Sequence, residues 1–128
     1  MVVVLLAKVE DIMTRSLIIY PKPERHVSRA IATMVDRGIG SILIYDGKEW
    51  GIVTRKDIMK KVLAPGKDPK AVRCSEIMSK PLITIDRGAD LKEAIKLMVE
   101  RDVRRLGVTE KGKLVGFVSN RDIIRSYM

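Results

Sequence analysis

The amino-acid sequence predicts an α/β (α+β) protein in which two βαββα repeats pack about a pseudo-two-fold axis. Three observations support this fold class: an internal repeat at an offset of 64 or 65 residues, one amphipathic helical segment in each copy, and apolar segments of strand length around each helix. One copy of about 60 residues is marginal as an independent core, whereas two related copies can bury their faces against each other. We therefore expect the pair of copies to be the functional unit.

The repeat begins at a short motif that we expect to form a helical entry to each copy. Its letters are DIMT in Asp11–Thr14 and EIMS in Glu76–Ser79, and the two methionines are 65 residues apart. An apolar pattern then recurs at an offset of 64, at Val27, Ala30, Ile31, Met34 and Val35 in the first copy and at Leu91, Ala94, Ile95, Met98 and Val99 in the second. Both sets fall at i, i+3, i+4, i+7 and i+8, which is the spacing of one face of an amphipathic helix.

The remaining apolar segments predict three strands in each copy. They are residues 17–20, 41–45 and 50–54 in the first copy, and 82–85, 106–108 and 114–119 in the second. Turns at Asp46-Gly47 and Lys111-Gly112 join the last two strands of each copy into a hairpin. Because these segments are apolar throughout, with no polar alternation, we expect helices to cover both faces of each sheet.

A second helix ends each copy, and we expect a linker between the copies. The second helices are predicted at residues 55–63 and 121–127. Two prolines and a glycine in the stretch 64–69 are typical of a linker. The predicted organisation is therefore a first repeat at residues 1–64, a linker at 65–74 and a second repeat at 75–128.

The chain carries a strong positive charge, which predicts an anionic partner. Its 128 residues include 25 Lys and Arg against 16 Asp and Glu, and the formal net charge is +9. Phosphate compounds, nucleic acids and acidic proteins all fit this charge. One Trp, one Phe and three Tyr leave few side chains for stacking single-stranded bases. A nucleic acid is therefore the alternative partner and not the first choice.

Other features of the composition exclude further classes of protein. The apolar run at residues 2–7 is far shorter than the roughly 20 residues that a bilayer span needs. We therefore expect no secretion and no membrane association, and the single cysteine of the chain favours the reducing cytoplasm as its location. Cys74 is the single cysteine and His26 the single histidine, so the chain has no internal disulfide and too few soft ligands for a zinc site. We expect no metal.

The residues that carry chemistry lie where a strand is followed by a helix. A Gly-x-x-Thr-x-x-Asp motif ends at Asp57 in the first copy, and a Gly-x-x-Ser-x-x-Asp motif ends at Asp122 in the second. Thr54 and Ser119 are natural N-caps, and an acid three residues later is typical of a capping box. The same carboxylates also suit the vicinal hydroxyls of a ribose, with Thr54 and Ser119 as neighbouring partners. Both interpretations stay open at this point.

Cations near the second motif suit a phosphate. Arg104-Arg105 precedes a predicted strand, and Arg121 lies next to the motif aspartate. Arginine is well suited to bidentate phosphate contacts. The first copy has Gly40-Ser41 in place of the arginine pair, and Lys56 is the cation that could compensate. We therefore expect two unequal sites, with the tighter one at the second motif.

The doubled motifs resemble the cystathionine-beta-synthase (CBS) domain family, and specifically a stand-alone tandem pair, also called a Bateman module. The resemblance runs from about Val9 to Ser126. It rests on Ile12-Met13-Thr14, Ile77-Met78-Ser79, the two Ala-Ile-x-x-Met helices, and the terminal Thr-Arg-Lys-Asp and Ser-Asn-Arg-Asp. It implies a regulatory module that binds AMP, ADP or ATP between repeats, with S-adenosylmethionine as a further option. We also expect a homodimer through the second helices, a choice that the resemblance supports. It rests on side chains that are more apolar than an exposed helix needs, namely Ile58, Met59, Val62, Ile123 and Ile124.

The resemblance further implies roles for individual residues. The acid at the position of Asp57 or Asp122 would hold the ribose, and the hydroxyl of Thr54 or Ser119 would assist. The basic pair Arg104-Arg105 would approach the phosphate. Groups near four further positions would enclose the base, namely Thr14, Ile18, Ile19 and Ile39.

An enzyme is the less favoured class. No evident base accompanies Cys74, and His26 lies in a loop that enters a helix. We therefore expect a nucleotide sensor without catalytic residues or cofactor, whose ligand-bound state is recognised by an effector protein. The alternative is a basic nucleic-acid-binding module.

Overall fold

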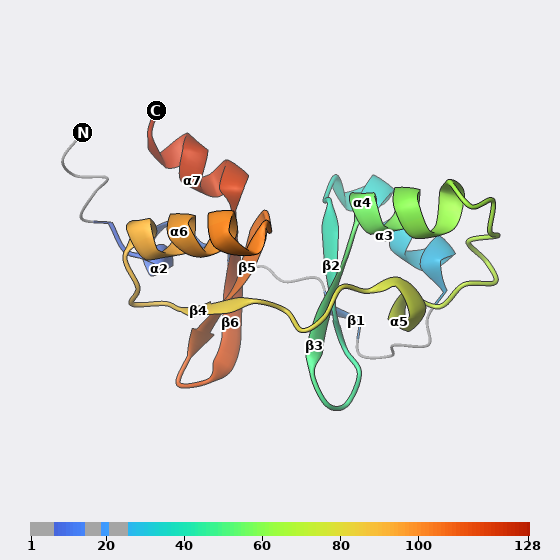
Figure 1. Cartoon of the computed structure of the whole chain (residues 1–128), viewed down its shortest axis with the longest axis horizontal. Coiled ribbons are helices and arrows are strands. Elements are labelled where there is room, and N and C mark those ends of the chain that lie inside the picture. Colours follow the sequence, from blue (N-terminus) through green and yellow to red (C-terminus); the bar gives the residue numbers. More distant parts are fainter. Residues whose placement is uncertain (1–6, 15–18, 21–25) are drawn as a thin grey trace. The chain divides into compact units, whose positions relative to one another are not determined.

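The computed structural model describes residues 7–14, 19–20 and 26–128, which form two compact units (Figure 1). One unit combines the described residues of segment 1–17 with residues 83–128, and we call it the 83–128 unit. The other holds the described residues of 18–82, and we call it the 18–82 unit. Each unit contains one three-stranded sheet.

The 18–82 unit has the predicted βαββα order, followed by one more helix (Figure 1). Its elements are β1 (Ile19–Tyr20), α3 (Val27–Arg37), β2 (Ser41–Tyr45), β3 (Trp50–Thr54), α4 (Arg55–Ile58), the π-helix η1 (Met59–Leu63) and α5 (Cys74–Ile77). The strand order is β1-β2-β3, with β1 parallel to β2 and β2 antiparallel to β3. Helix α3 supplies the crossover that parallel neighbours require.

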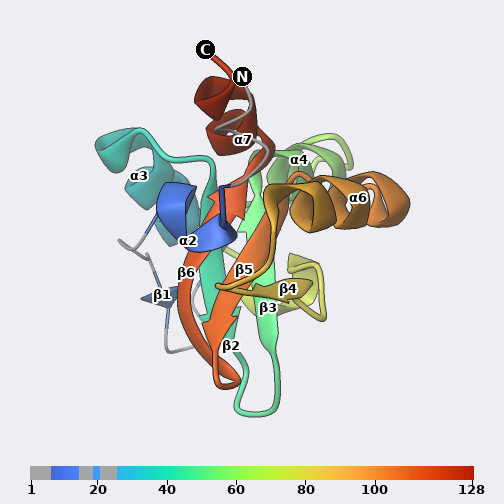
Figure 2. The same ribbon diagram turned by 90° about the vertical axis from the view of Figure 1, so that its left-hand side faces the viewer.

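The 83–128 unit repeats this topology (Figure 2). Its elements are α2 (Val9–Ile12), β4 (Thr84–Asp86), α6 (Leu91–Arg101), β5 (Arg105–Glu110), β6 (Lys113–Ser119) and α7 (Asn120–Ser126). The strand order is β4-β5-β6, again one parallel and one antiparallel pair. Lys111 and Gly112, at the turn between β5 and β6, both have positive φ, as a tight hairpin of this hand requires. The predicted α/β class and the two βαββα repeats are confirmed.

The compact units differ from the sequence repeats in the short helix that each includes. Helix α5 begins the second repeat in the sequence, yet Cys74 and Ile77 are buried in the core of the 18–82 unit. Helix α2 begins the first repeat, yet Val9 is buried in the core of the 83–128 unit. Each unit is therefore built from the βαββα segment of one repeat and the entry helix of the other.

The last residues of the expected linker at 65–74 belong to the hydrophobic core of the 18–82 unit. Val72 is buried, its carbonyl accepts a 2.8 Å hydrogen bond from the backbone N–H of Val27, and Cys74 is the first residue of α5. The apolar side chains at the end of this stretch pack against the 18–82 core, so the chain is held there instead of spanning freely between repeats.

The two long helices confirm the predicted apolar pattern in part. Three positions of each helix are buried: Val27, Ala30 and Met34 in α3, and Leu91, Ala94 and Met98 in α6. The prediction was wrong at the i+8 position, because Val35 is 74% exposed and Val99 is 75% exposed. At 100° per residue, i+8 lies about 80° around the helix from the first position, at the margin of the buried stripe.

Among the strands whose burial the structure describes, the central strand of each sheet is the one buried on both faces. Ile42, Leu43 and Ile44 of β2 are buried in succession, as are residues 106–108 of β5. The edge strands β3 and β6 alternate between buried and half-buried residues over most of their length. The expectation that helices cover both faces throughout is therefore wrong for the edge strands, where one face keeps contact with solvent.

The first strands differ slightly from prediction. Strand β4 begins at Thr84 and not at residue 82, although Leu82 is buried. In the first copy, residues 17 and 18 lie outside the described residues, and β1 covers Ile19–Tyr20. Among the helices that the structure describes, none has the length and hydropathy needed to cross a bilayer.

Burial of Cys74 makes a prediction about reactivity and pH. Burial raises the pKa of the Cys74 thiol to about 11. Between the ordinary thiol pKa, near 8.5, and this value, the native state binds more protons than the unfolded state, so stability should fall as pH rises from about 9 to 11. Urea unfolding followed by circular dichroism at pH 8, 9 and 10 should show this loss. Cys74→Ala should flatten it, and an unchanged slope in that variant would contradict the assignment.

Candidate functional site

Backbone pairing brings an entry segment beside each motif. In the 83–128 unit, Phe117 and Thr14 exchange two backbone hydrogen bonds of 2.8 and 3.0 Å. Ser79 and Ile52 exchange an equivalent pair in the 18–82 unit. A Cβ on Gly116 would lie only 2.6 Å from the carbonyl oxygen of Thr14, so the motif needs glycine there for the segment to approach.

The second motif forms a capping box in which one carboxylate oxygen stays open. The backbone N–H and hydroxyl of Ser119 each donate to Oδ2 of Asp122 at 2.9 Å, and the backbone N–H of Asp122 donates to the Ser119 hydroxyl at 3.1 Å. Among the described residues, no donor reaches Oδ1 of Asp122. The capping interpretation is confirmed, and the half-buried carboxylate still has acceptor capacity for a ligand.

The predicted cations lie at the same end of the 83–128 unit. Arg105 is opposite Ser119 in the antiparallel β5–β6 pair. The carbonyl of Arg104 accepts a 2.8 Å hydrogen bond from the backbone N–H of Asn120, the first residue of α7. Arg121 is exposed and adjacent to Asp122 in the helix. The fold therefore gathers three guanidinium-bearing residues around the start of α7, as the spacing predicts.

The first motif is also a capping box, but its carboxylate is saturated. Oδ2 of Asp57 accepts from the backbone N–H of Thr54 at 2.9 Å and from its hydroxyl at 3.0 Å. Oδ1 accepts from the hydroxyl of Ser79 at 3.0 Å and lies 3.0 Å from Nζ of Lys61. Asp57 is the buried charged residue of the described chain. Its environment therefore differs from that of Asp122, although the two motifs have the same letters.

Sequence reasoning missed Lys61 and Ser79 as partners of the first motif. Lys61 is one helical turn after Asp57, at the i, i+4 spacing that brings side chains together. That spacing was visible in the sequence. Ser79 lies 22 residues away along the chain, and only the packing of the segment after α5 places it beside the carboxylate.

The other predicted residues of the first copy, Gly40, Ser41 and Lys56, are not among the described partners of the Asp57 carboxylate. The carbonyl of Gly40 accepts from the backbone N–H of Arg55 at 3.3 Å, and Ser41 is opposite Thr54 in the sheet. These two residues thus occupy the places that the arginine pair has in the other unit. Lys56 is exposed, and none of the described residues pairs with it.

The residues expected to enclose a base are divided between the units. Thr14 belongs to the 83–128 unit, whereas Ile19 and Ile39 belong to the 18–82 unit. Ile19 is opposite Leu43 in the parallel strand pair, and Ile39 packs partly buried against the core. Ile18 lies outside the described residues.

The two residues considered for catalysis, His26 and Cys74, each lie at the start of a helix. His26 is the N-cap of α3 without a side-chain capping bond, and Cys74 is fully buried. Within the described chain, no three His, Cys, Asp or Glu side chains come together as a metal site would require.

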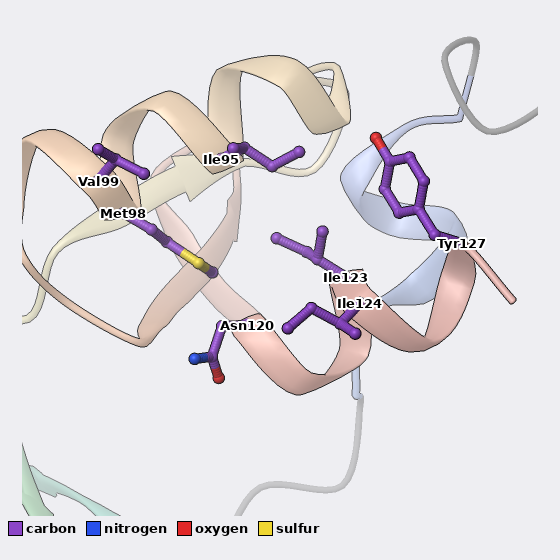
Figure 3. Close-up of a pocket in the computed structure, with 7 residues that line it drawn as sticks. All are labelled: Ile95, Met98, Val99, Asn120, Ile123, Ile124 and Tyr127. Atoms are coloured by element: carbon purple, nitrogen blue, oxygen red, sulfur yellow. The ribbon is translucent and has the colours of Figure 1, made fainter.

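An apolar groove of about 350 Å³ lies between α6 and α7 (Figure 3). Its lining residues are Ile95, Met98, Val99, Asn120, Ile123, Ile124 and Tyr127. In Figure 3, Met98 extends from α6 toward α7. Ile124 is 67% exposed, which is unusual for a large aliphatic side chain on a helix.

Comparison with known proteins gives consistent matches over nearly the whole chain. The family model of the CBS domain matches twice, at residues 9–64 and 74–128. An uncharacterized protein of Methanopyrus kandleri is 41% identical over 95 residues, which are 72% of this chain and 48% of that protein. This chain therefore spans about half the length of that relative.

Solved structures share the architecture. A hexameric CBS-CP12 protein from bloom-forming cyanobacteria has a TM-score of 0.86 at 28% identity, over 92% of this chain and 66% of that one. A CBS domain pair in complex with 5′-methylthioadenosine and S-adenosyl-L-methionine has a TM-score of 0.81 at 24% identity, over 94% of this chain and 95% of that one.

The unequal environments of the two motif aspartates predict unequal effects on stability. Asp57→Ala should lower the free energy of unfolding by about 2–3 kcal/mol, because it removes the cap and leaves Lys61 and Ser79 without their acceptor. Asp122→Ala should cost about 1 kcal/mol, the value typical of a lost cap. Urea unfolding of both variants at pH 7 measures the difference. Equal losses would show that the extra contacts of Asp57 contribute nothing to stability.

Proposed function

Because the chain belongs to the CBS domain family, whose members are generally regulatory modules without catalysis, we propose that it is a sensor that binds an adenine nucleotide and leaves it unchanged. AMP, ADP and ATP are the proposed ligands, and S-adenosylmethionine is a further option. The structurally similar CBS domain pair that was solved in complex with 5′-methylthioadenosine and S-adenosyl-L-methionine supports this ligand class. The proposed output is a shift in the population of a state that an effector protein recognises.

One observation carries the proposal: Asp122 keeps an open carboxylate oxygen among cations. Ser119 orients the carboxylate through Oδ2, and Oδ1 is left for a ligand. The two acceptor positions of Oδ1 suit the vicinal hydroxyls of a ribose, the group that an acidic residue binds in dinucleotide-binding folds. The polar group of Ser119 fixes the carboxylate in advance, so binding requires little reordering.

The neighbouring residues suit the rest of a nucleotide. Arg105, opposite Ser119 in the sheet, and Arg104 beside it are proposed to bind the phosphate, with Arg121 as a third cation. Backbone and apolar groups near Thr14, and near Ile18, Ile19 and Ile39, are proposed to enclose the base. The net charge of +9 adds long-range attraction for an anionic ligand.

The second part of the proposal is a homodimer through the second helices. Of the five side chains expected at this interface, Ile58, Val62 and Ile123 are instead buried within the units. Met59 in η1 and the corresponding Ile124 in α7 are exposed. Apolar side chains repeated at matching places on both units suit association with a second copy of the chain. The hexameric neighbour, an oligomer of the same family, supports self-association.

Nucleotide binding should depend on the second motif. Isothermal titration with AMP and ATP should give tight binding that Asp122→Ala and Arg105→Ala each weaken about 10- to 100-fold, the loss expected for one charge-assisted hydrogen bond. Asp57→Ala should change the affinity little, provided that it folds. Chromatography after long incubation should recover ATP unchanged.

Several results would contradict this assignment. Loss of tight binding in Asp57→Ala but not in Asp122→Ala would reverse the two sites. ATP turnover that persists through further purification would indicate an enzyme. Binding of RNA or DNA with a steep salt dependence, together with no nucleotide binding, would favour the nucleic-acid alternative.

Self-association should depend on the exposed apolar side chains of the second helices. Sedimentation velocity at micromolar protein should show a dimer, and Ile124→Glu should shift it to monomer because a charge in an apolar interface is costly to bury. Lys113→Ala, at an exposed position of β6, changes the net charge by the same amount and should leave the dimer intact. A monomeric wild-type protein, with and without nucleotide, would refute the proposal.

A further inference from the structure

We propose that Lys61 closes the first motif to ligands, so that the chain offers one ribose-binding carboxylate and not two. This inference rests on the proposed function, because it states which motif carboxylate is available to a nucleotide. It assigns to Lys61 the role of a specificity-determining residue that sets the number of ligands per chain.

The ammonium group of Lys61 is held at two points. Its Nζ lies 3.0 Å from Oδ1 of Asp57 and donates a 2.8 Å hydrogen bond to the carbonyl of Ile77. The carboxylate of Asp57 in turn receives Lys61 and the Ser79 hydroxyl on Oδ1, and Thr54 on Oδ2. A carboxylate has about four acceptor positions, so these donors fill Asp57. Only 8% of the Asp57 side chain is exposed.

The 83–128 unit lacks this closure at the corresponding place. Ser126 stands one helical turn after Asp122, as Lys61 does after Asp57, and its hydroxyl donates to the carbonyl of Ile123 at 2.6 Å. The short side chain is thus bonded to its own helix and supplies no cation. Over the described part of the chain, Ser119 is the one residue that donates to the Asp122 carboxylate.

A local difference in helix geometry accompanies the lysine. Lys61 lies in η1, where the backbone N–H of Ala64 donates to the carbonyl of Met59 at 2.8 Å, the i to i+5 spacing of a π-helix. The corresponding turns of α7 are ordinary α-helix. Short π-helical turns are often found at functional positions. The irregular turn is confined to the unit whose carboxylate is closed.

A ribose at Asp57 would have to displace two donors at once. Removing the ammonium leaves a buried carboxylate without its counter-charge, and removing the Ser79 hydroxyl releases the segment after α5. Each lost charge-assisted hydrogen bond corresponds to about 10- to 100-fold in affinity. The first motif should therefore stay empty at nucleotide concentrations that fill the second.

The test removes the lysine from the first motif and introduces a lysine at the corresponding position of the second. Titration of the full chain with AMP should give one site per chain in the wild type and two in Lys61→Met. The added site should disappear in Lys61→Met combined with Asp57→Asn. Lys60→Met, an exposed neighbour with the same change of side chain, is the matched control and should keep one site. Ser126→Lys places an ammonium four residues after Asp122 and should weaken the remaining site about 10-fold or more.

Each result decides between the two proposals. If the wild type and Lys61→Met each bind AMP at one site, Lys61 does not close the first motif, and the proposed function is unaffected. Two sites in the wild type would lead to the same conclusion. If the wild type binds none of AMP, ADP, ATP and S-adenosylmethionine, the proposed function is wrong. Binding that then appears only in Lys61→Met supports the closure, and its absence overturns it.

Thermal unfolding without ligand separates folding from binding. Lys61→Met should lower the unfolding midpoint by about 4 °C or more when Asp57 is present. In the Asp57→Asn background the loss should be much smaller, because the ion pair between the two side chains is already broken. Equal shifts in the two backgrounds would show that Lys61 does not hold Asp57, and would overturn the closure.

Discussion

The close approach of each entry segment to an edge strand determines the rest of the structure. Glycine at the facing position favours this approach: a Cβ on Gly116 would lie 2.6 Å from the carbonyl oxygen of Thr14, and one on Gly51 3.2 Å from the carbonyl oxygen of Ser79. Two backbone hydrogen bonds fix each segment in place. These bonds give the edge strands a partner, so their backbone groups are not left unpaired along that stretch.

This pairing also decides what surrounds the motif carboxylates. The segment that follows α5 brings the hydroxyl of Ser79 to Asp57, where it completes the set of donors with Lys61. The segment that follows α2 brings Thr14 to the same place beside the other motif, but Asp122 receives only Ser119 among the described residues. The two capping boxes have the same pattern but differ in their carboxylates. That of Asp57 is filled by donors from within the unit, whereas that of Asp122 retains acceptor capacity.

The helices combine burial with exposed apolar surface. In α3 and α6 the first, fourth and eighth positions form the buried stripe, while the ninth, Val35 or Val99, lies outside it. Burial therefore stabilises a limited face of each helix, to which Ile31 and Ile95 add partly buried contacts, whereas Val35 and Val99 do not contribute to the cores of the units. Exposed apolar side chains lower the solubility of a protein, so their presence is a reason to expect that another surface covers them.

The sequence alone determined the repeat, the βαββα order, the hairpin strands 41–45 and 50–54, the helices of each copy, and the capping boxes at Asp57 and Asp122. These follow from periodicity, turn chemistry and residue spacing, which are local properties of the chain. It also placed Arg105 near Ser119, because a hairpin register links the two ends of neighbouring strands. Only the tertiary structure decided that each entry helix packs on the unit formed by the other repeat, and that Ser79 and Lys61 together fill the Asp57 carboxylate. The reason is physical: the two copies carry nearly the same local signals, so local sequence cannot choose which core an entry helix joins, and that choice depends on burial and pairing between segments far apart in the chain.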